Sequence, residues 1–428
     1  MEFRHRRGEN DEKASSLTKF SNGNSTEPDD QNTQHQHKEE RDSDAITSTT
    51  EKYLLTDSSQ LSSDAKLSTL TKSSTLSSFK KSSKRRSNLS KAGYGILCNA
   101  IAGLLILYVA IPIWFYSCPW LRQHIVFLTV LTIPPFLNLS NPDSFELYCP
   151  RNFYVESEPG LKLGAWYIPS INEPCDKNAP LTFAGHDPVV LYLHGNAGSR
   201  GGTHRVGLYK LLTSQAKVHV VAIDYRGYGD SSTIKMPTVA GLVHDAMAAY
   251  RKIRETVPNK RIIVWGHSLG TGVSTYLMAN LTELKDLPAG LVLESPFDML
   301  ANAVKHNPMA RLHRFMPFFE KVFVDSLNNH PATNFNSLEK SKLISPKLPI
   351  VILEAKDDLV IPFELSETLY QSFLEVRQGR PDKGPIDFVT FAREYGYGHK
   401  YIYTHPGLAQ KMRIFFDEAT SSTIDLNS

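Results

Sequence analysis

The chain divides into three regions by its pattern of hydrophobic and polar positions. Residues 1–91 are rich in Ser, Thr, Asn, Asp, Glu and Lys. Their only aromatic residues are Phe3, Phe20, Tyr53 and Phe79. From Ala92 to Leu121 no side chain is charged, and after residue 150 short apolar runs alternate with helix-like stretches. This order predicts a polar tail, a membrane segment and a globular domain.

The polar tail, residues 1–91, buries too little apolar surface to offset the cost of ordering its backbone, so we expect it to be disordered. It ends in a basic run that comprises Lys80, Lys81, Lys84, Arg85, Arg86 and Lys91. We interpret this run as a determinant of membrane topology. Contact with anionic lipids and phosphorylation at Ser87 stay open as further roles.

A membrane-spanning helix is predicted at residues 95–116. At 1.5 Å per residue these 22 residues reach about 33 Å, enough to cross a hydrocarbon core of about 30 Å. Aromatic residues follow where an interfacial belt is expected, namely Trp114, Tyr116 and Trp120. The basic run before the span predicts a cytosolic N-terminus and a catalytic part on the far side of the membrane.

A second apolar stretch, residues 124–138, is short and contains Pro134 and Pro135. We expect it to lie at the membrane interface rather than to span, although a second span would return the following domain to the cytosol. Glycosylation distinguishes these topologies, because Asn138 and Asn280 are sequons that only the first topology exposes to the lumen.

Composition excludes several classes of protein. Four cysteines in 428 residues exclude a disulfide-built scaffold, but Cys149 and Cys175 share one compartment and could bridge. The net charge, 47 − 44 = +3, is too balanced for nucleic-acid binding to be expected.

Residues 150–420 predict one α/β domain. A hairpin is expected around Pro159-Gly160. Buried strands are then expected at 187–195, 218–227, 261–268, 289–296, 348–358 and 385–391. Their alternation with helical stretches specifies a mostly parallel sheet covered by helices.

A candidate nucleophile lies where the strand at 261–268 meets the next helical stretch. Gly266-His267-Ser268-Leu269-Gly270 has the G-x-S-x-G pattern of a nucleophile elbow. Its glycines permit a sharp turn that places the Ser268 hydroxyl at a helix N-terminus, where negative charge is favoured.

The serine requires a base and an orienting acid, in the chain order Ser, acid, His. Asp358 is the preferred acid because its D-x-x-I-P context fits a turn after a strand, and Asp357 is the alternative. His399 is the preferred base because it lies in a Gly-punctuated loop before the final helix. His405, which precedes a proline, is the alternative.

An acyl-transfer site also needs donors for the developing oxyanion. We expect the main-chain N–H groups of Leu269 and Asn196 to supply them, the latter from the Gly-rich loop 194–198. That loop lacks the G-K-[ST] ending of a phosphate-binding loop, and no metal-ligand spacing is present, so we expect no cofactor and no metal.

A lid is predicted at about 297–345. It carries Phe315, Phe318, Phe319 and Phe323. These rings could contact a lipid acyl chain or simply pack onto the core. Arg200 and Arg205 could contact an anionic head group, or serve only solubility.

Several of these segments resemble one known family. They are LYLHGNAGSRGGTHRVGLYKLL, AIDYRGYGDS, VWGHSLGTGVST, LVLESPFD, AKDDLVIPF and GYGHKYIY. Over about residues 95–415 the chain resembles the membrane-anchored α/β-hydrolases that are lysophosphatidylserine and monoacylglycerol lipases, the α/β-hydrolase domain-containing protein 12 subfamily. The resemblance implies Ser268, Asp358 and His399 as the triad, residence in the endoplasmic reticulum and a lumenal active site. The long tail and the insertion NEPCDKNAPLTFAGHDP depart from the pattern.

Three hypotheses of function follow. The first is a serine hydrolase that cleaves lysophospholipids or monoacylglycerols. The second is a thioesterase that depalmitoylates proteins, which a cytosolic active site favours and a glycan on Asn280 opposes. The third is a non-catalytic membrane-tethered interaction module, which failure of Ser268 to react with a fluorophosphonate would favour.

Overall fold

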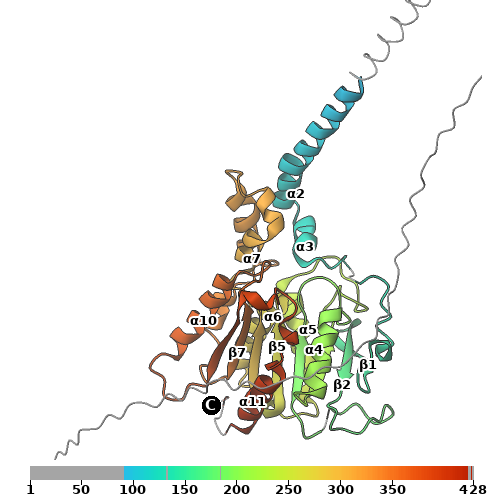
Figure 1. The fold of residues 1–428 in the computed structure, drawn as a ribbon, viewed down its shortest axis with the longest axis vertical. Helices are drawn as coiled ribbons and strands as arrows, with labels where there is room; N and C mark the ends of the chain where they lie inside the picture. Colours follow the sequence, from blue (N-terminus) through green and yellow to red (C-terminus); the bar gives the residue numbers. More distant parts are fainter. Residues whose placement is uncertain (1–90, 132–133, 184, 423–425, 427–428) are drawn as a thin grey trace, which may run out of the picture. The chain divides into compact units, whose positions relative to one another are not determined.

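The architecture is an eight-stranded sheet covered by helices (Figure 1). The structure is a computed structural model and describes residues 91–131, 134–183, 185–422 and 426. The predicted disordered tail and most of its basic run therefore lie outside the described residues.

The strands follow the order β1-β2-β4-β3-β5-β6-β7-β8. Their bounds are β1 Arg151–Glu158, β2 Leu161–Ile168, β3 Val189–Leu193, β4 His219–Ile223, β5 Ile262–His267, β6 Gly290–Glu294, β7 Ile350–Ala355 and β8 Ile386–Phe391. β1 and β2 form the expected hairpin, and β2 pairs antiparallel with β4, whereas every pair from β4 to β8 is parallel. The predicted mostly parallel α/β fold is confirmed.

Successive side chains of each central strand enter opposite faces of the sheet, which explains the continuous apolar runs. On β5, Val264 belongs to one core and Trp265 to the other. The first core is covered by α5 Val239–Arg254, α6 Leu269–Glu283 and α10 Phe363–Arg377, and the second by α4 Thr203–Ser214 and α11 Leu408–Ser421.

One described helix is long and apolar enough to cross a membrane. It runs over Lys91–Ser117, 27 residues with a mean hydropathy of 2.4 in its most apolar window. Its length is about 40 Å at 1.5 Å per residue. Most of its large apolar side chains are exposed, as a lipid-facing helix requires. The helix is consistent with the predicted membrane anchor.

This helix changes register at the π turn η1 Ile106–Ala110, just before Pro112 of α2 Ile111–Ser117. The Ile111 N–H binds the Ile106 carbonyl, and Pro112 has no N–H to give, so the Leu107 carbonyl lacks a donor from its own helix. His313 supplies that donor through Nε2 at 3.0 Å. The contact ties the lid segment to the helix.

The lid segment, residues 297–345, consists of short helices. They are α7 Leu300–His306, η4 Pro308–Leu312, η5 Glu320–Asp325, α8 Ser326–Asn328 and α9 Ser337–Ser341. The four phenylalanines singled out in the sequence have different surroundings. Phe319 is buried in the first core, whereas Phe315 and Phe318 are 71% and 43% exposed. Phe323 packs against Phe115 of α2, with ring centroids 5.0 Å apart. The lid segment therefore contacts both the core and the apolar helix.

The second apolar stretch does not continue as a long helix. It begins in α3 Pro119–Phe127, whose C-terminal Val126 and Phe127 are buried in the first core, while Val130 and Phe136 are exposed. Part of the stretch is thus bound to the domain. A location of the remainder at a membrane interface stays a prediction.

A disulfide joins Cys149, just before β1, to Cys175 in the insertion between β2 and β3. This bond answers a question that the sequence left open. Cys98 and Cys118 are free.

Candidate active site

The candidate nucleophile Ser268 lies at the sharp turn between β5 and α6, with φ 51° and ψ −116°. Two flanking glycines are required by close approaches at this turn. A Cβ at Gly270 would collide with the carbonyl oxygen of Leu193, and one at Gly266 would meet the Gly270 backbone and the Ser274 hydroxyl. A non-glycine residue at positive φ is strained, and such strain is commonly held at functional sites.

Three hydrogen bonds, to Glu294 and Thr271, hold the backbone of this strained residue. The Ser268 N–H donates to the Glu294 carbonyl on β6 at 2.9 Å. The Ser268 carbonyl accepts from the Thr271 N–H at 2.8 Å and from the Thr271 hydroxyl at 2.6 Å. The backbone at the turn is therefore fixed independently of the serine side chain.

The structure brings together the serine, histidine and aspartate that the sequence selected. The Ser268 hydroxyl lies 2.9 Å from His399 Nε2, and His399 Nδ1 lies 2.6 Å from Asp358 Oδ2. The other carboxylate oxygen, Oδ1, accepts from the N–H groups of Val360 and Ile361 at 2.7 and 2.9 Å. With the proton on Nδ1, the histidine can accept the serine proton at Nε2 while the carboxylate stabilises the resulting imidazolium.

The alternative acid and base have other partners. Asp357 Oδ2 accepts from the Gly398 N–H at 2.8 Å and so fixes the loop that carries His399. His405 Nδ1 lies 3.0 Å from the Tyr397 hydroxyl, and its ring packs on Phe391. Neither residue reaches the serine.

His267, predicted only as an elbow residue, contacts His399 directly. Its Nε2 lies 2.9 Å from the His399 carbonyl, which can only accept, so Nε2 carries the proton. Burial, together with His399, lowers the pKa of His267 well below its ordinary value. The neutral ring thus holds the His399 backbone. No sequence signal distinguishes this role, because the middle positions of the elbow pattern are unspecified.

Two main-chain N–H groups are available for an oxyanion. Leu269 is the first residue of α6, and a helix leaves its first N–H groups without intrahelical acceptors. In the loop after β3, the Ala197 N–H binds the Asn196 side chain at 3.0 Å, and the Gly198 N–H binds the Leu131 carbonyl at 2.9 Å. Within the part of the chain that the structure describes, the Asn196 N–H has no such partner.

The two arginines expected at a head group are buried, which corrects that expectation. Arg200 donates to Asp224 at 2.5 Å and to Asp230 at 2.6 Å, and its guanidinium lies 5.1 Å from the Trp166 ring. Since Asp224 is fully buried as well, the pair satisfies itself inside the protein. Arg200, which follows a loop in the sequence, therefore forms an ion pair with Asp224 in the interior, and only the folded chain brings the two together.

Arg205 is also enclosed, and its partners are backbone carbonyls of the Gly-rich loop. Its Nη2 lies 2.9 Å from the oxygens of both Gly195 and Ala197, and its Nη1 lies 2.5 Å from the oxygen of Ser199. A substrate head group therefore has no access to this guanidinium.

Sequence reasoning missed two buried carboxyl groups near the triad, at the ends of β6 and β7. Burial raises the pKa of Glu294 to about 7, although a hydrogen bond from Trp265 Nε1 at 2.9 Å opposes the shift. Burial and the nearby Asp358 carboxylate raise the pKa of Glu354 well above its ordinary value, and the Ser366 hydroxyl donates to it. Only their positions at strand ends could have drawn attention to them.

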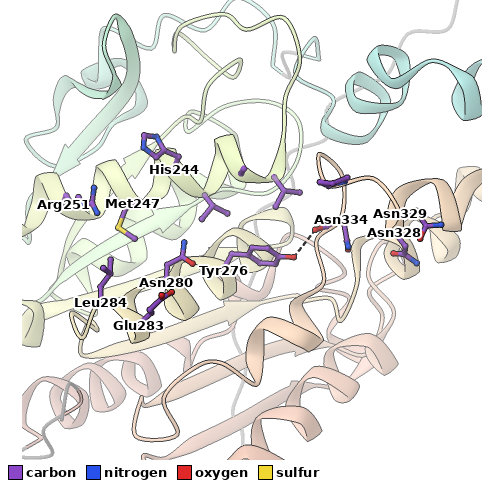
Figure 2. A pocket seen from close by; sticks show the side chains of 14 residues that line it. His244, Met247, Arg251, Tyr276, Asn280, Glu283, Leu284, Asn328, Asn329 and Asn334 are labelled. Carbon is purple, nitrogen blue, oxygen red and sulfur yellow. Dashed lines mark hydrogen bonds between the residues drawn. The ribbon is translucent and has the colours of Figure 1, made fainter.

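A cleft of about 950 Å³ lies between α5, α6 and the loop that ends in Asn334 (Figure 2). Tyr276 crosses it to donate to the Asn334 carbonyl at 3.0 Å. None of the three triad residues lines this cleft. Asn280 does, with an exposed side chain, and Asn138 is exposed elsewhere. Among residues 91–131, 134–183, 185–422 and 426, no group of His, Cys, Asp or Glu could hold a metal ion.

Comparison with known proteins gives a consistent result. A family model described as "alpha/beta hydrolase fold" matches residues 188–391. The lysophosphatidylserine lipase ABHD12 of Danio rerio is 38% identical over 311 residues, which cover 71% of this chain and 79% of that protein. Protein ABHD12B of Homo sapiens is 32% identical over 312 residues, which cover 70% and 82%. An esterase structure from Pyrococcus furiosus aligns with 21% identity and a TM-score of 0.47, over 66% of this chain and 96% of that one.

Proposed function

The chain belongs to the family of the ABHD12 lysophosphatidylserine lipases, α/β-hydrolases that act as serine hydrolases, and from this premise we propose that it cleaves acyl esters of lysophospholipids. Monoacylglycerols, which also carry a single acyl ester, are a second substrate class within the proposal. The lipase names belong to the relatives, and their transfer to this chain is our inference.

The continuous hydrogen-bonded chain from Ser268 through His399 to Asp358 carries the proposal. In the first half-reaction, His399 Nε2 takes the hydroxyl proton while Ser268 Oγ forms a bond to the ester carbonyl carbon. The oxyanion that forms accepts hydrogen bonds from the N–H groups of Leu269 and Asn196. When the carbon–oxygen bond to the glycerol breaks, the leaving alcohol takes the proton from His399, and an acyl-serine remains.

Water completes the second half-reaction. His399 removes a proton from the water while its oxygen attacks the acyl carbon of the acyl-serine. Collapse of this second tetrahedral intermediate returns the proton to Ser268 Oγ and releases the fatty acid. No cofactor is needed for either half, because each proton moves between the substrate, water and the imidazole.

A membrane lipid is favoured as substrate by the exposed apolar surface of the lid segment. The lid segment carries exposed Phe315 and Phe318, and Tyr108 of the apolar helix packs against Phe315 with ring centroids 5.3 Å apart. Apolar rings that face solvent beside a membrane helix suit a substrate with one long acyl chain and a polar head.

The proposal includes a location in the endoplasmic reticulum membrane, with one span, a cytosolic N-terminus and a lumenal catalytic domain. Asn138→Gln and Asn280→Gln test it in cells. We expect each single variant to lose one glycan, measured as a shift on gels with and without an endoglycosidase. An unglycosylated wild type would contradict the topology and revive the thioesterase hypothesis, which a cytosolic active site favours.

The activity is tested with the full chain in microsomal membranes. We expect wild type to react with a fluorophosphonate and to release fatty acid from lysophosphatidylserine or monoacylglycerol, and Ser268→Ala to lose both by about 10³-fold or more. Ser372→Ala, which removes a buried hydroxyl in α10, is the matched control.

Two results would reject the proposal. Fatty-acid release retained by Ser268→Ala would show that another group is the nucleophile. Cleavage of a palmitoyl-cysteine peptide without cleavage of either lipid would instead assign a thioesterase, and no reaction with the fluorophosphonate would favour a non-catalytic protein.

A further inference from the structure

Arg205 is a buried cation that the proposed mechanism leaves without a role. It is 3% exposed, and no carboxylate of the described residues lies within ion-pair distance of its guanidinium. A buried charge of this kind is costly unless it is fully hydrogen-bonded. Its Nη1 and Nη2 donate to the carbonyls of Gly195, Ala197 and Ser199 and, at 3.5 Å, to that of Asn196, all in the loop that follows β3. Its Nε has no hydrogen-bond partner among the described residues. The guanidinium of Arg205 thus binds the backbone of a single loop.

One of these carbonyls is linked rigidly to the proposed oxyanion donor. The Gly195 C=O and the Asn196 N–H belong to the same peptide unit, and in a trans peptide the two groups point in opposite directions. The Gly195 oxygen accepts from Arg205 Nη2 at 2.9 Å and from His194 Nδ1 at 2.7 Å. Two donors on the carbonyl side therefore fix the direction of the N–H on the other side.

The same peptide lies next to the nucleophile. A Cβ built on Gly195 would lie 3.1 Å from Ser268 Cβ and 2.8 Å from His267 Nδ1. The absence of a side chain at position 195 thus lets the backbone approach the serine closely. A small rotation of this peptide plane would move the Asn196 N–H away from the position that an oxyanion on the attacked carbon occupies.

The loop would not keep this shape by its own preference. Ala197 and Gly198 both have positive φ, 59° and 66°, and alanine rarely adopts that conformation. Arg205 holds the Ala197 carbonyl from one side. On the other side the Asn196 side chain donates to the Val126 carbonyl at 2.7 Å. The loop is therefore clamped between α4 and the segment that follows the apolar helix.

We propose that Arg205 is a positioning residue that, by binding the Gly195 and Ala197 carbonyls, aims the Asn196 N–H at the oxyanion. The inference rests on the proposed function, since it assigns a role within that reaction. The contribution is expected in the transition state and not in substrate binding, because the oxyanion forms only during attack.

The test is Arg205→Lys in the full chain in membranes. Lysine keeps the charge but cannot span several carbonyls as the planar guanidinium does. We expect kcat to fall by about 10- to 100-fold with KM changed less than about twofold. An acyl trifluoromethyl ketone adds to Ser268 Oγ and gives a hemiketal with a negative charge on the former ketone oxygen. The affinity for this inhibitor should fall by a similar factor. The midpoint of the pH profile of kcat should stay unchanged.

Arg377→Lys is the matched control. Arg377 is a second buried arginine that donates to backbone carbonyls, those of Leu348 and Phe373, but on α10. Both variants are assayed about 10 °C below the lower of their melting temperatures, so that a loss of folding does not enter the comparison. Arg205→Ala, assayed with and without millimolar methylguanidinium, gives a second measurement: rescue of kcat supports the role.

Two outcomes separate this inference from the proposed function. An active wild type with equal kcat for Arg205→Lys and Arg377→Lys would overturn the role of Arg205 alone. A wild type that cleaves none of the lipid esters would remove the proposed function itself. A loss confined to KM in Arg205→Lys would also overturn the inference, because it would indicate a contact to the ground-state substrate.

Discussion

The candidate active centre and the lid segment differ in the surroundings of their side chains. In the centre, Ser268 and Asp358 are buried, and their side chains are hydrogen-bonded to His399 and to backbone N–H groups. In the lid segment, residues 297–345, the side chains of Leu312, Phe315 and Phe318 are largely exposed, although Tyr108 contacts one edge of Phe315. One region is fixed from every side, whereas the other presents apolar surface to its surroundings.

This difference separates two requirements of a lipid hydrolase. Acyl transfer needs donors and a base held within a few tenths of an ångström, because misplaced groups lose most of their effect. Capture of an acyl chain needs only apolar area of roughly suitable shape. The following variants test whether the two regions divide the work in this way.

The largest effect is expected in the active centre. Asp358→Asn should lower kcat by about 10⁴-fold, because the amide can no longer hold the histidine in the tautomer that accepts the serine proton. Asp357→Asn is the matched control and should cost far less, since that side chain binds only the Gly398 N–H. The measurement is hydrolysis of lysophosphatidylserine by each full-length variant. Equal losses in the two variants would mean that the acid has been assigned to the wrong residue.

The second effect concerns the burial of Glu294 beside the active centre and the pH dependence of stability that follows from it. The pKa of Glu294 is raised from its ordinary 4.5 to about 7 by burial, so between these values the folded protein holds a proton that the unfolded chain releases. Its contribution to stability is therefore complete below pH 4.5 and is lost as the pH rises through 7, by up to about 3 kcal/mol. Glu294→Gln, which can still accept from Trp265, should remove this part of the pH dependence and leave the part due to Glu354, whose pKa is raised as well.

The measurement is the free energy of unfolding between pH 5 and pH 8 for both proteins. Glu375→Gln, at an exposed position on α10, should leave the pH dependence as it is in wild type. Equal slopes in wild type and Glu294→Gln would contradict the prediction, because they would indicate that the Glu294 carboxyl group is hydrated in the folded protein.

The smallest effect is expected in the lid segment. Replacing Phe315 and Phe318 together with serine removes exposed apolar area and should raise KM for a long-chain lysolipid by about tenfold, with kcat nearly unchanged. A short, water-soluble ester should be hydrolysed as by wild type. Ile414→Ser, at an exposed apolar position on α11, is the control. A fall in kcat for both substrates would contradict this division, because it would show that the lid segment also shapes the active centre.

Features that depend on residues close together in the sequence could be predicted, whereas those that depend on distant segments could not. The sheet could be predicted strand by strand, because a strand buried on both faces must be apolar throughout, as in residues 189–193. The elbow could be located because only glycine fits at its tight positions: a Cβ at Gly270 would collide with the Leu193 carbonyl oxygen. The choice of His399 over His405 rested on loop context, and the structure brings the former to the serine.

The burial of the two arginines could not be predicted from the sequence. Both Arg200 and Arg205 follow a Gly-rich loop in a context that is typical of exposed residues, yet both are enclosed. Asp224, which pairs with Arg200, lies after a different strand, and the carbonyls around Arg205 converge only when the loop has folded. Partners of this kind have no fixed separation along the chain.

The sequence by itself determined the α/β architecture and the apolar helix and predicted the order of serine, acid and histidine, since each depends on period, composition or local sterics. Only the tertiary structure decided that Cys149 and Cys175 bridge, that Leu107 accepts from His313, and that Arg205 donates to the Gly195 and Ala197 carbonyls. These contacts join segments that are separate in the chain, and their geometry depends on how the sheet and its loops pack in three dimensions.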